Sequence, residues 1–273
     1  MIWPGIITKG DSNRGEGFAL KPGQTAIYNA TVGWSGRIWA RTGCNFDKTG
    51  TGTCQTGSCG TSLNCTGPSN PPNTIAEFTL GDDVDFYDLS LVDGYNLPIV
   101  ISPINGKGNC SIAGCEGDLR QNCSSELAVK SNGKVIACRS ACNAFNTDEY
   151  CCRGAFADPA ACQPSNYSRS FKQVCPAASS YAFDDRASII TCSASEYIII
   201  FCASRWAARI FDAPFDRKKK DGKSSKKIYK SVWTIFWPTN YLFVIPGIKA
   251  CALIRTRSLF AIHQLVRPHL PWT

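Results

Sequence analysis

The chain has 273 residues, including 16 cysteines and 2 histidines, and carries a formal net charge of +8. Residues 1–202 contain 15 Lys and Arg against 18 Asp and Glu, a charge of −3, whereas residues 203–273 contain 14 against 3, a charge of +11. The basic excess therefore belongs to the C-terminal part alone and gives no reason to expect a nucleic-acid partner.

The first 202 residues read as short β-strands separated by Gly, Pro and Asn turns. Alternating apolar and polar residues predict strands at 25–28, 36–40 and 77–80, and Ile-rich runs predict late strands at 188–191 and 197–201. Helical pattern is confined to 124–130 and, more weakly, 137–145. The pattern predicts a mainly β protein, and a chain of this length can bury a real core.

Residues 203–273 have a different composition. A run of basic residues between Arg217 and Lys230 is typical of a solvated linker. The apolar stretch over 232–254 is interrupted by Pro238, Pro246 and Lys249, so it lacks the twenty or so continuous apolar residues of a membrane-spanning helix. We expect residues 203–273 to be a basic and then apolar tail that is not part of the fold and does not contact a membrane.

Fifteen of the 16 cysteines lie between Cys44 and Cys202, and Cys251 stands apart. Metal sites favour Cys-x-x-Cys motifs, and the chain has none; no histidine precedes residue 263 to complete a mixed site. Short spacings and the Cys151–Cys152 doublet suit disulfides instead. We therefore expect an oxidised framework with no metal and no cofactor, and hence a secreted, extracellular protein.

Glycosylation sequons favour the same compartment. Five Asn-x-Ser/Thr motifs occur, and three of them have cysteine at the middle position, which lowers glycan occupancy. The first five residues have neither the basic nor the apolar region of a signal peptide, so none is visible in this chain. We give the cysteines more weight and expect a secreted glycoprotein with sequons at Asn29, Asn64, Asn109, Asn122 and Asn166.

Several separate motifs fall between residues 39 and 152. They are Trp-Ala-Arg-Thr-Gly-Cys-Asn-Phe-Asp at 39–47, Gly-Thr-Cys-Gln-Thr-Gly-Ser-Cys at 52–59, Ala-Glu-Phe at 76–78, Asp-Phe-Tyr-Asp-Leu-Ser-Leu-Val-Asp-Gly-Tyr-Asn-Leu-Pro at 85–98 and Glu-Tyr-Cys-Cys at 149–152. Over about residues 3–202 the chain resembles the thaumatin-like proteins, a family that includes osmotin-like, pathogenesis-related plant defence proteins.

The resemblance implies a flattened β-sandwich with two smaller units. The sandwich would cover 1–42, 78–116 and 176–202, a small disulfide loop domain 43–77, and a cysteine-rich helical domain 117–175, with a cleft between the sandwich and the helical domain. The family's first strand, whose cysteine bonds the one matching Cys202, is missing from this chain. We therefore expect Cys202 and Cys251 to be left over as a pair.

The resemblance also implies seven disulfides within residues 1–202. These are Cys44–Cys54, Cys59–Cys65, Cys110–Cys192, Cys115–Cys175, Cys123–Cys138, Cys142–Cys151 and Cys152–Cys162.

Carboxylates are the reactive groups that residues 1–202 contain in quantity. Because no histidine is present there, Ser-His-Asp and Cys-His catalysis are excluded. Glycoside hydrolysis needs only two carboxyl groups, one protonated and one ionised, and like charges gathered in a cleft raise the pKa of one of them. The composition is therefore compatible with a glycosidase as well as with a non-catalytic protein.

The resemblance places five charged residues in the cleft: Arg41, Glu77, Asp88, Asp93 and Asp184. We expect Glu77 and Asp93 to serve as the acid and the base or nucleophile. Asp88 and Asp184 would set the electrostatic field, and Arg41 would organise it. The aromatic candidates for stacking on sugar rings are Phe86, Tyr87 and Tyr95.

From these features we expect a secreted, antifungal, monomeric defence-type protein. Its acidic cleft would bind the cell-wall polysaccharide β-1,3-glucan or a similar carbohydrate, with weak or no endo-hydrolysis. Two alternatives stay open: a non-enzymatic inhibitor or stress-response binding protein, whose partners would be microbial surface proteins or enzymes, and a truncated, defective family member.

Overall fold

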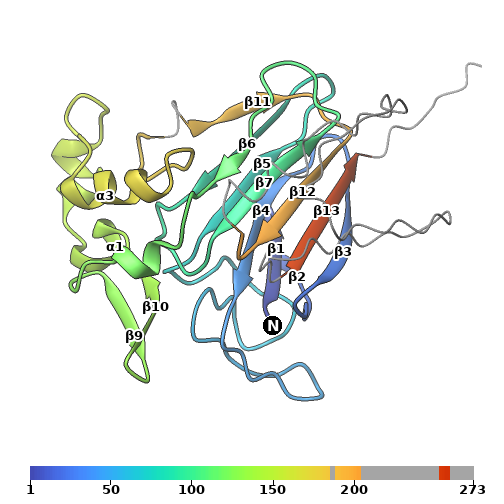
Figure 1. Ribbon diagram of the computed structural model, residues 1–273, viewed down its shortest axis with the longest axis horizontal. Helices are drawn as coiled ribbons and strands as arrows, with labels where there is room; N and C mark the ends of the chain where they lie inside the picture. The colour runs from blue at the N-terminus through green and yellow to red at the C-terminus, as the bar shows by residue number, and fades with distance from the viewer. Residues whose placement is uncertain (185–187, 204–251, 259–273) are drawn as a thin grey trace, which may run out of the picture.

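The computed structural model describes residues 1–184, 188–203 and 252–258, and two β-sheets enclose its main core (Figure 1). The larger sheet has six antiparallel strands in the order β11-β6-β5-β4-β1-β2. Their bounds are β1 (Trp3–Thr8), β2 (Asp11–Gly17), β4 (Ser35–Arg41), β5 (Ile75–Thr79), β6 (Asp85–Ser90) and β11 (Ile190–Cys192). Strand β5 begins before the expected sandwich boundary at 78.

The second sheet has five strands in the order β3-β13-β12-β7-β8. Strand β13 pairs with β12 in antiparallel and with β3 in parallel orientation. The bounds are β3 (Gln24–Ala30), β7 (Ile99–Ile104), β8 (Ala113–Gly114), β12 (Glu196–Phe201) and β13 (Ala252–Ser258).

Alternation along the strands builds the core between the two sheets. Ile38 and Phe78 from the six-stranded sheet and Ile199 and Phe201 from the five-stranded sheet belong to one buried cluster. Because side chains alternate between the faces of a strand, the neighbouring positions on β4, β5 and β6 point away from this core. The outer face of the six-stranded sheet carries charged and hydroxyl side chains beside a second, smaller buried cluster that includes Ile7, Trp39 and Ile75. The fold is a mainly β sandwich, as the sequence predicts.

The expectation that all of residues 203–273 lie outside the fold is wrong at Ala252–Ser258. Strand β13 lies inside the five-stranded sheet, with six residue pairs to β12 and seven to β3 (Figure 1). The two prolines that argued against a structured tail, Pro238 and Pro246, both precede this strand, so they do not interrupt its ladder. Residues 204–251 and 259–273 lie outside the described residues.

The cysteine-rich helical part lies beside the sheets (Figure 1). It contains 3₁₀ turns η1 (Leu119–Asn122) and η2 (Gly154–Phe156) and helices α1 (Ala141–Phe145), α2 (Asp148–Cys151) and α3 (Asn166–Val174). Each α-helix is preceded by a hydroxyl residue that accepts a hydrogen bond from a backbone N–H of its first turn: Ser140, Thr147 and Ser165.

The helix expected over 124–130 is not formed. Residues Ala128–Ser131 instead form β9, which pairs with β10 (Lys134–Cys138). Asn132 and Gly133 connect them with φ of 47° and 74°, the left-handed conformation of a tight hairpin turn. The second expected helix, 137–145, begins only at Ala141 because 137–138 complete β10. Among the described residues, no helix has the length and apolar character needed to cross a membrane.

Seven disulfides connect the same cysteines that the resemblance implies: Cys44–Cys54, Cys59–Cys65, Cys110–Cys192, Cys115–Cys175, Cys123–Cys138, Cys142–Cys151 and Cys152–Cys162. Such a framework is typical of proteins that fold in an oxidising compartment. Cys202 is disulfide-bonded as well. Cys251 lies outside the described residues, so its pairing with Cys202 stays a prediction.

Candidate functional site

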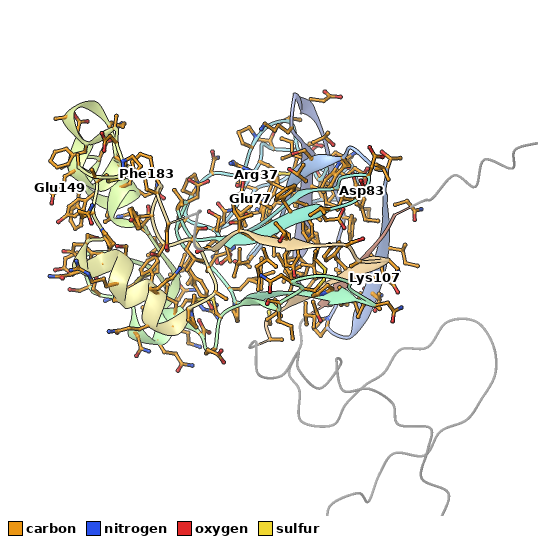
Figure 2. All side chains as sticks on the ribbon, turned by 90° about the horizontal axis from the view of Figure 1, so that it is seen from above. Arg37, Glu77, Asp83, Lys107, Glu149 and Phe183 are labelled. Atoms are coloured by element: carbon orange, nitrogen blue, oxygen red, sulfur yellow. A yellow bond between two sulfur atoms is a disulfide. The ribbon has the colours of Figure 1, made fainter. Side chains whose placement is uncertain are left out.

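A groove with a volume of about 430 Å³ crosses the outer face of the six-stranded sheet. It runs from the β1–β2 turn at Lys9 and Gly10, over β4, β5 and β6, to Ile189 just before β11. Arg37 and Glu77, which line it, lie close together in Figure 2. These strands supply core residues from their other face, so the same alternation that builds the sandwich also builds the floor of the groove.

Three charged side chains form a row across the centre of this groove. Arg37 on β4 lies opposite Glu77 on β5, and Glu77 lies opposite Asp88 on β6. Directly opposed residues on antiparallel strands have Cβ atoms about 5 Å apart, so the three side chains are neighbours on this face. Arg37 Nε donates a hydrogen bond of 2.7 Å to Glu77 Oε1, and Ser179 Oγ donates one of 3.2 Å to Asp88 Oδ2. The register thus places Arg37, Glu77 and Asp88 side by side on three neighbouring strands.

Asp93 lies in the loop between β6 and β7. Burial raises the pKa of its carboxyl group, and the positive charge of Arg37 opposes this shift. A buried carboxyl whose pKa is raised is the kind of group that serves as a general acid. Asp93 thus lies within the field of Arg37, but it is not among the residues that line the groove.

The Asp93→Asn variant is expected to melt at a higher temperature than the wild type at pH 7. Because native Asp93 holds its proton more tightly than an unfolded aspartate does, its ionisation costs stability as the pH rises from about 4 through the raised native pKa. The difference in melting temperature between the two proteins should shrink towards pH 3, where Asp93 is protonated in both the native and the unfolded state. Melting curves over this pH range test the prediction, and a wild type more stable than the variant at pH 7 would contradict it.

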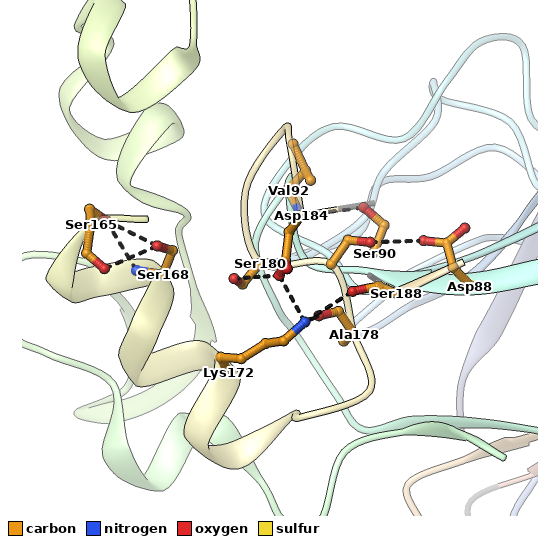
Figure 3. A network of polar contacts seen from close by, with 11 residues as sticks. Asp88, Ser90, Val92, Ser165, Ser168, Lys172, Ala178, Ser180, Asp184 and Ser188 are labelled. Carbon is orange, nitrogen blue, oxygen red and sulfur yellow. Dashed lines mark hydrogen bonds and ion pairs between the residues drawn. The ribbon is translucent and has the colours of Figure 1, made fainter. Parts of the chain in front are cut away.

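Asp184 is occupied by a different set of contacts. Its Oδ2 accepts hydrogen bonds from Lys172 Nζ at 2.9 Å and from the backbone N–H and hydroxyl of Ser180, both at 2.8 Å (Figure 3). Lys172 belongs to α3, and it also donates to Ala178 O and to Ser188 Oγ. Asp184 therefore connects the chain before β11 to helix α3 through an ion pair with Lys172. The sequence had instead predicted that the charge of Asp184 acts on the cleft.

Arg41 does not line the groove, contrary to expectation. Its side chain is fully buried and donates hydrogen bonds to four backbone carbonyls, and its guanidinium lies 5.1 Å from the centre of the Phe46 ring. Burial lowers the pKa of Arg41 to about 10. The accepting carbonyls belong to Trp3, Pro4, Ser62 and Leu63. Arg41 joins β1 to the disulfide loop, and Arg37 is the arginine that the groove presents.

Only one of the three aromatic candidates is available to a ligand in the groove. Phe86 is 46% exposed and lines the groove beside Ile189, which is equally exposed. Tyr87 and Tyr95 are buried at 1% and 0% exposure. Tyr87 donates its hydroxyl hydrogen bond to Ser111 O and packs on Tyr197. These two tyrosines therefore stabilise the core and cannot stack on a sugar.

The sequence interpretation also missed polar groups at the edges of the groove. Ser35 Oγ and Thr79 Oγ1 are 2.9 Å apart on β4 and β5, and Lys9 stands at the β1–β2 turn. The alternation of β4 and β5 places Ser35, Arg37, Glu77 and Thr79 on one face, which is the signal that could have identified them.

The expected cleft between the sandwich and the helical part is narrow. A crevice of about 60 Å³ lies there, and its lining includes Val92, Tyr150, Tyr167, Phe171 and Tyr181. Glu149 is the carboxylate that lines it. Glu77 and Asp88 line the larger groove instead, so the groove is the candidate functional site.

Comparison with known proteins agrees with this architecture. Residues 1–203 match the model of the thaumatin family. "Pathogenesis-related thaumatin-like protein 3.5" of Cryptomeria japonica is 54% identical over 206 residues, covering 74% of this chain and 85% of that protein. "Pathogenesis-related protein 5" of Arabidopsis thaliana is 52% identical over 204 residues, with the same two coverages.

Among solved structures, the thaumatin-like xylanase inhibitor is 30% identical and matches with a TM-score of 0.32 over 40% of this chain and 73% of that one. The family match covers most of the chain, and the two plant relatives are identical at more than half of the aligned positions. The chain therefore belongs to the thaumatin family.

Proposed function

We propose that the protein is a secreted defence protein whose groove binds β-1,3-glucan or a similar neutral cell-wall polysaccharide. The observation that carries the proposal is the row of Arg37, Glu77 and Asp88 across an open groove that ends at the exposed ring of Phe86. The pathogenesis-related names of its relatives support the defence role.

The chemistry of the groove suits a sugar chain. Hydroxyl groups of a pyranose both donate and accept, and the groove offers carboxylate acceptors, a guanidinium donor and the hydroxyl pair of Ser35 and Thr79. Phe86 supplies an apolar ring for the C–H face of a sugar. A flat, mixed polar and apolar floor of this kind favours a neutral chain lying across the strands.

Hydrolysis, if present, would be weak because the groove carboxylates are already engaged. Glu77 is ion-paired to Arg37 at 2.7 Å, and Asp88 accepts a hydrogen bond from Ser179. Asp93, whose pKa burial raises, would be the acid, and Glu77 the ionised base or nucleophile. Glu77 would have to leave its ion pair to reach a sugar, which adds to the barrier.

Calorimetric titration with laminarin, a soluble β-1,3-glucan, tests the proposal. Glu77→Gln is expected to weaken binding at least about tenfold, a loss of about 1.4 kcal/mol, because a hydrogen-bonding charge is removed from the groove centre. Asp83→Asn is the matched control, since Asp83 is exposed and is not among the residues lining the groove. Equal affinity of wild type and Glu77→Gln would refute the assignment.

A reducing-sugar assay on the same laminarin then separates binding from turnover. Slow release that Asp93→Asn abolishes would assign weak hydrolysis to the Asp93 and Glu77 pair. Binding without release would identify a non-catalytic glucan-binding protein.

A further inference from the structure

Strand β3 (Gln24–Ala30) is an edge strand of the described part of the five-stranded sheet. It pairs with β13 along its whole length and has no second sheet partner among the described residues. An open edge presents unpaired backbone groups to another chain, and proteins protect such edges with charges, prolines or a covering group. The outer side of β3 therefore needs a device that prevents edge-to-edge pairing.

The outward face of β3 adds an apolar side chain to this edge. Ala26, Tyr28 and Ala30 pack on the core, so the alternate residues face outward. Ile27 is 56% exposed, among the most exposed large apolar side chains of the described residues. Asn29 follows it by two positions and lies on the same face. An exposed isoleucine on an edge strand raises the cost of leaving that edge unprotected.

Asn29 begins the sequon Asn29-Ala30-Thr31, and both Asn29 and Thr31 are exposed. The other four sequons are less suitable. Three of them have as their middle residue Cys65, Cys110 or Cys123, each held in a disulfide.

The fourth alternative is Asn166 at the start of α3. Its side-chain oxygen accepts a hydrogen bond from Arg169, and the hydroxyl of Ser168 in the same sequon is buried against Ser165. A glycan there would have to displace contacts that begin the helix. Of the two sequons without a cysteine at the middle position, Asn29 is the one whose side chain makes no described hydrogen bond.

We propose that Asn29 carries an N-linked glycan and that this glycan shields Ile27 and the open edge of β3. In the transfer, the side-chain amide nitrogen of Asn29 bonds to the anomeric carbon of a lipid-pyrophosphate-linked oligosaccharide. The bond from that carbon to the pyrophosphate oxygen breaks, the lipid pyrophosphate leaves, and one amide proton is released. The sugar then covers the face two residues from Ile27.

The position of this glycan leaves the groove open. Strand β3 belongs to the five-stranded sheet, whereas the groove lies on the outer face of the six-stranded sheet, with the core between them. Glycosylation of Asn29 is therefore independent of what the groove binds, and removal of the glycan should leave the affinity for laminarin unchanged.

Peptide mapping of the full chain, secreted from a eukaryotic host behind a secretion leader, tests the modification. Enzymatic release of N-glycans in ¹⁸O water marks each occupied asparagine as ¹⁸O-labelled aspartate. We expect the peptide containing Asn29 to be labelled in most molecules. Thr31→Val should lose one glycan in gel mobility, while the matched Ser168→Ala should not. An unlabelled Asn29 peptide overturns the proposal. For a variant that is not secreted, translation in the presence of microsomal membranes shows from the gel mobility whether the glycan is attached.

Light scattering after size-exclusion chromatography tests the shielding. Native protein stripped of its glycan is expected to form dimers or larger species at concentrations where the glycosylated protein is monomeric, and Ile27→Lys should restore the monomer. If the stripped protein stays monomeric at every concentration, the shielding role is wrong even where Asn29 is occupied.

Discussion

Deleting everything after Ala203 is expected to lower the melting temperature by about 10 °C or more. The deletion removes β13, which supplies the only described sheet partner of β3 and one of the two partners of β12. Loss of several ladder hydrogen bonds, each worth about 1 kcal/mol net, costs at least a few kcal/mol, and each kcal/mol shifts the melting temperature of a domain this size by about 2–4 °C. Differential scanning calorimetry of the two proteins measures the change.

A point substitution in the full chain separates the strand from the rest of the tail. Ile254 lies at the centre of β13, opposite Ile199 on β12 and Ala26 on β3. Ile254→Pro removes a backbone donor from a central strand and should destabilise the protein nearly as much as the deletion, whereas Ile254→Val keeps the strand. If the deletion and Ile254→Pro both melt like the wild type, β13 does not contribute to the fold in solution.

Replacing Arg41 by Met is expected to destabilise the protein by about 3 kcal/mol or more. In the wild type, the Arg41 guanidinium donates to four backbone carbonyl groups, and the substitution removes this donor. Each buried acceptor that loses its partner costs about 1–3 kcal/mol. Urea unfolding monitored by tryptophan fluorescence gives the free energy of unfolding. The folded variant should still bind laminarin, because Arg41 does not line the groove.

Arg37→Met is the matched control and should behave in the opposite way. Arg37 has 49% of its side chain exposed, and an ion pair of this kind contributes about 1 kcal/mol or less to stability. Its loss should leave the unfolding free energy nearly unchanged and weaken laminarin binding. If Arg41→Met, rather than Arg37→Met, weakened binding while remaining as stable as the wild type, the assignment of the two arginines would be reversed.

The two arginines show why the site could be predicted only in part from the sequence. Arg37, Trp39 and Arg41 alternate with Ile38 and Ala40, so the pattern of β4 places all three on the outer face. The loop between β4 and β5 then covers the end of this face, since Trp39 packs with Cys59 and Cys65 and donates to Gly57 O. Arg37 stays exposed and Arg41 is buried because the loop between β4 and β5 covers only one end of this face. The periodicity of a strand does not show where such a loop packs.

The same distinction holds for the fold. Strands with clear alternation, such as β3, β4 and β12, were predicted close to their observed bounds. The β9–β10 hairpin was missed although Asn132-Gly133 is a strong turn signal, because the flanking run was interpreted as a helix. Strand β13 was missed because its place is decided by partners far away in sequence, at β3 and β12, and local composition could not reveal them.

The burial of the tyrosines follows the same rule. Phe86, Tyr87 and Asp88 are consecutive on β6, so Tyr87 must point to the opposite face from Phe86 and Asp88. The two adjacent aromatic side chains therefore cannot form one surface for a sugar ring. The period of the strand was sufficient to assign Phe86 to the groove and Tyr87 to the core.

The central claim is that the glucan lies across β4, β5 and β6, and amide chemical shifts during titration with a short β-1,3-glucan oligosaccharide test it most directly. In ¹⁵N-labelled protein, the largest shift changes are expected at Arg37, Glu77 and Phe86, with none at Tyr150 or Tyr167, which line the crevice beside the helical part. Shift changes confined to the crevice, or no changes at saturating oligosaccharide, would contradict the claim.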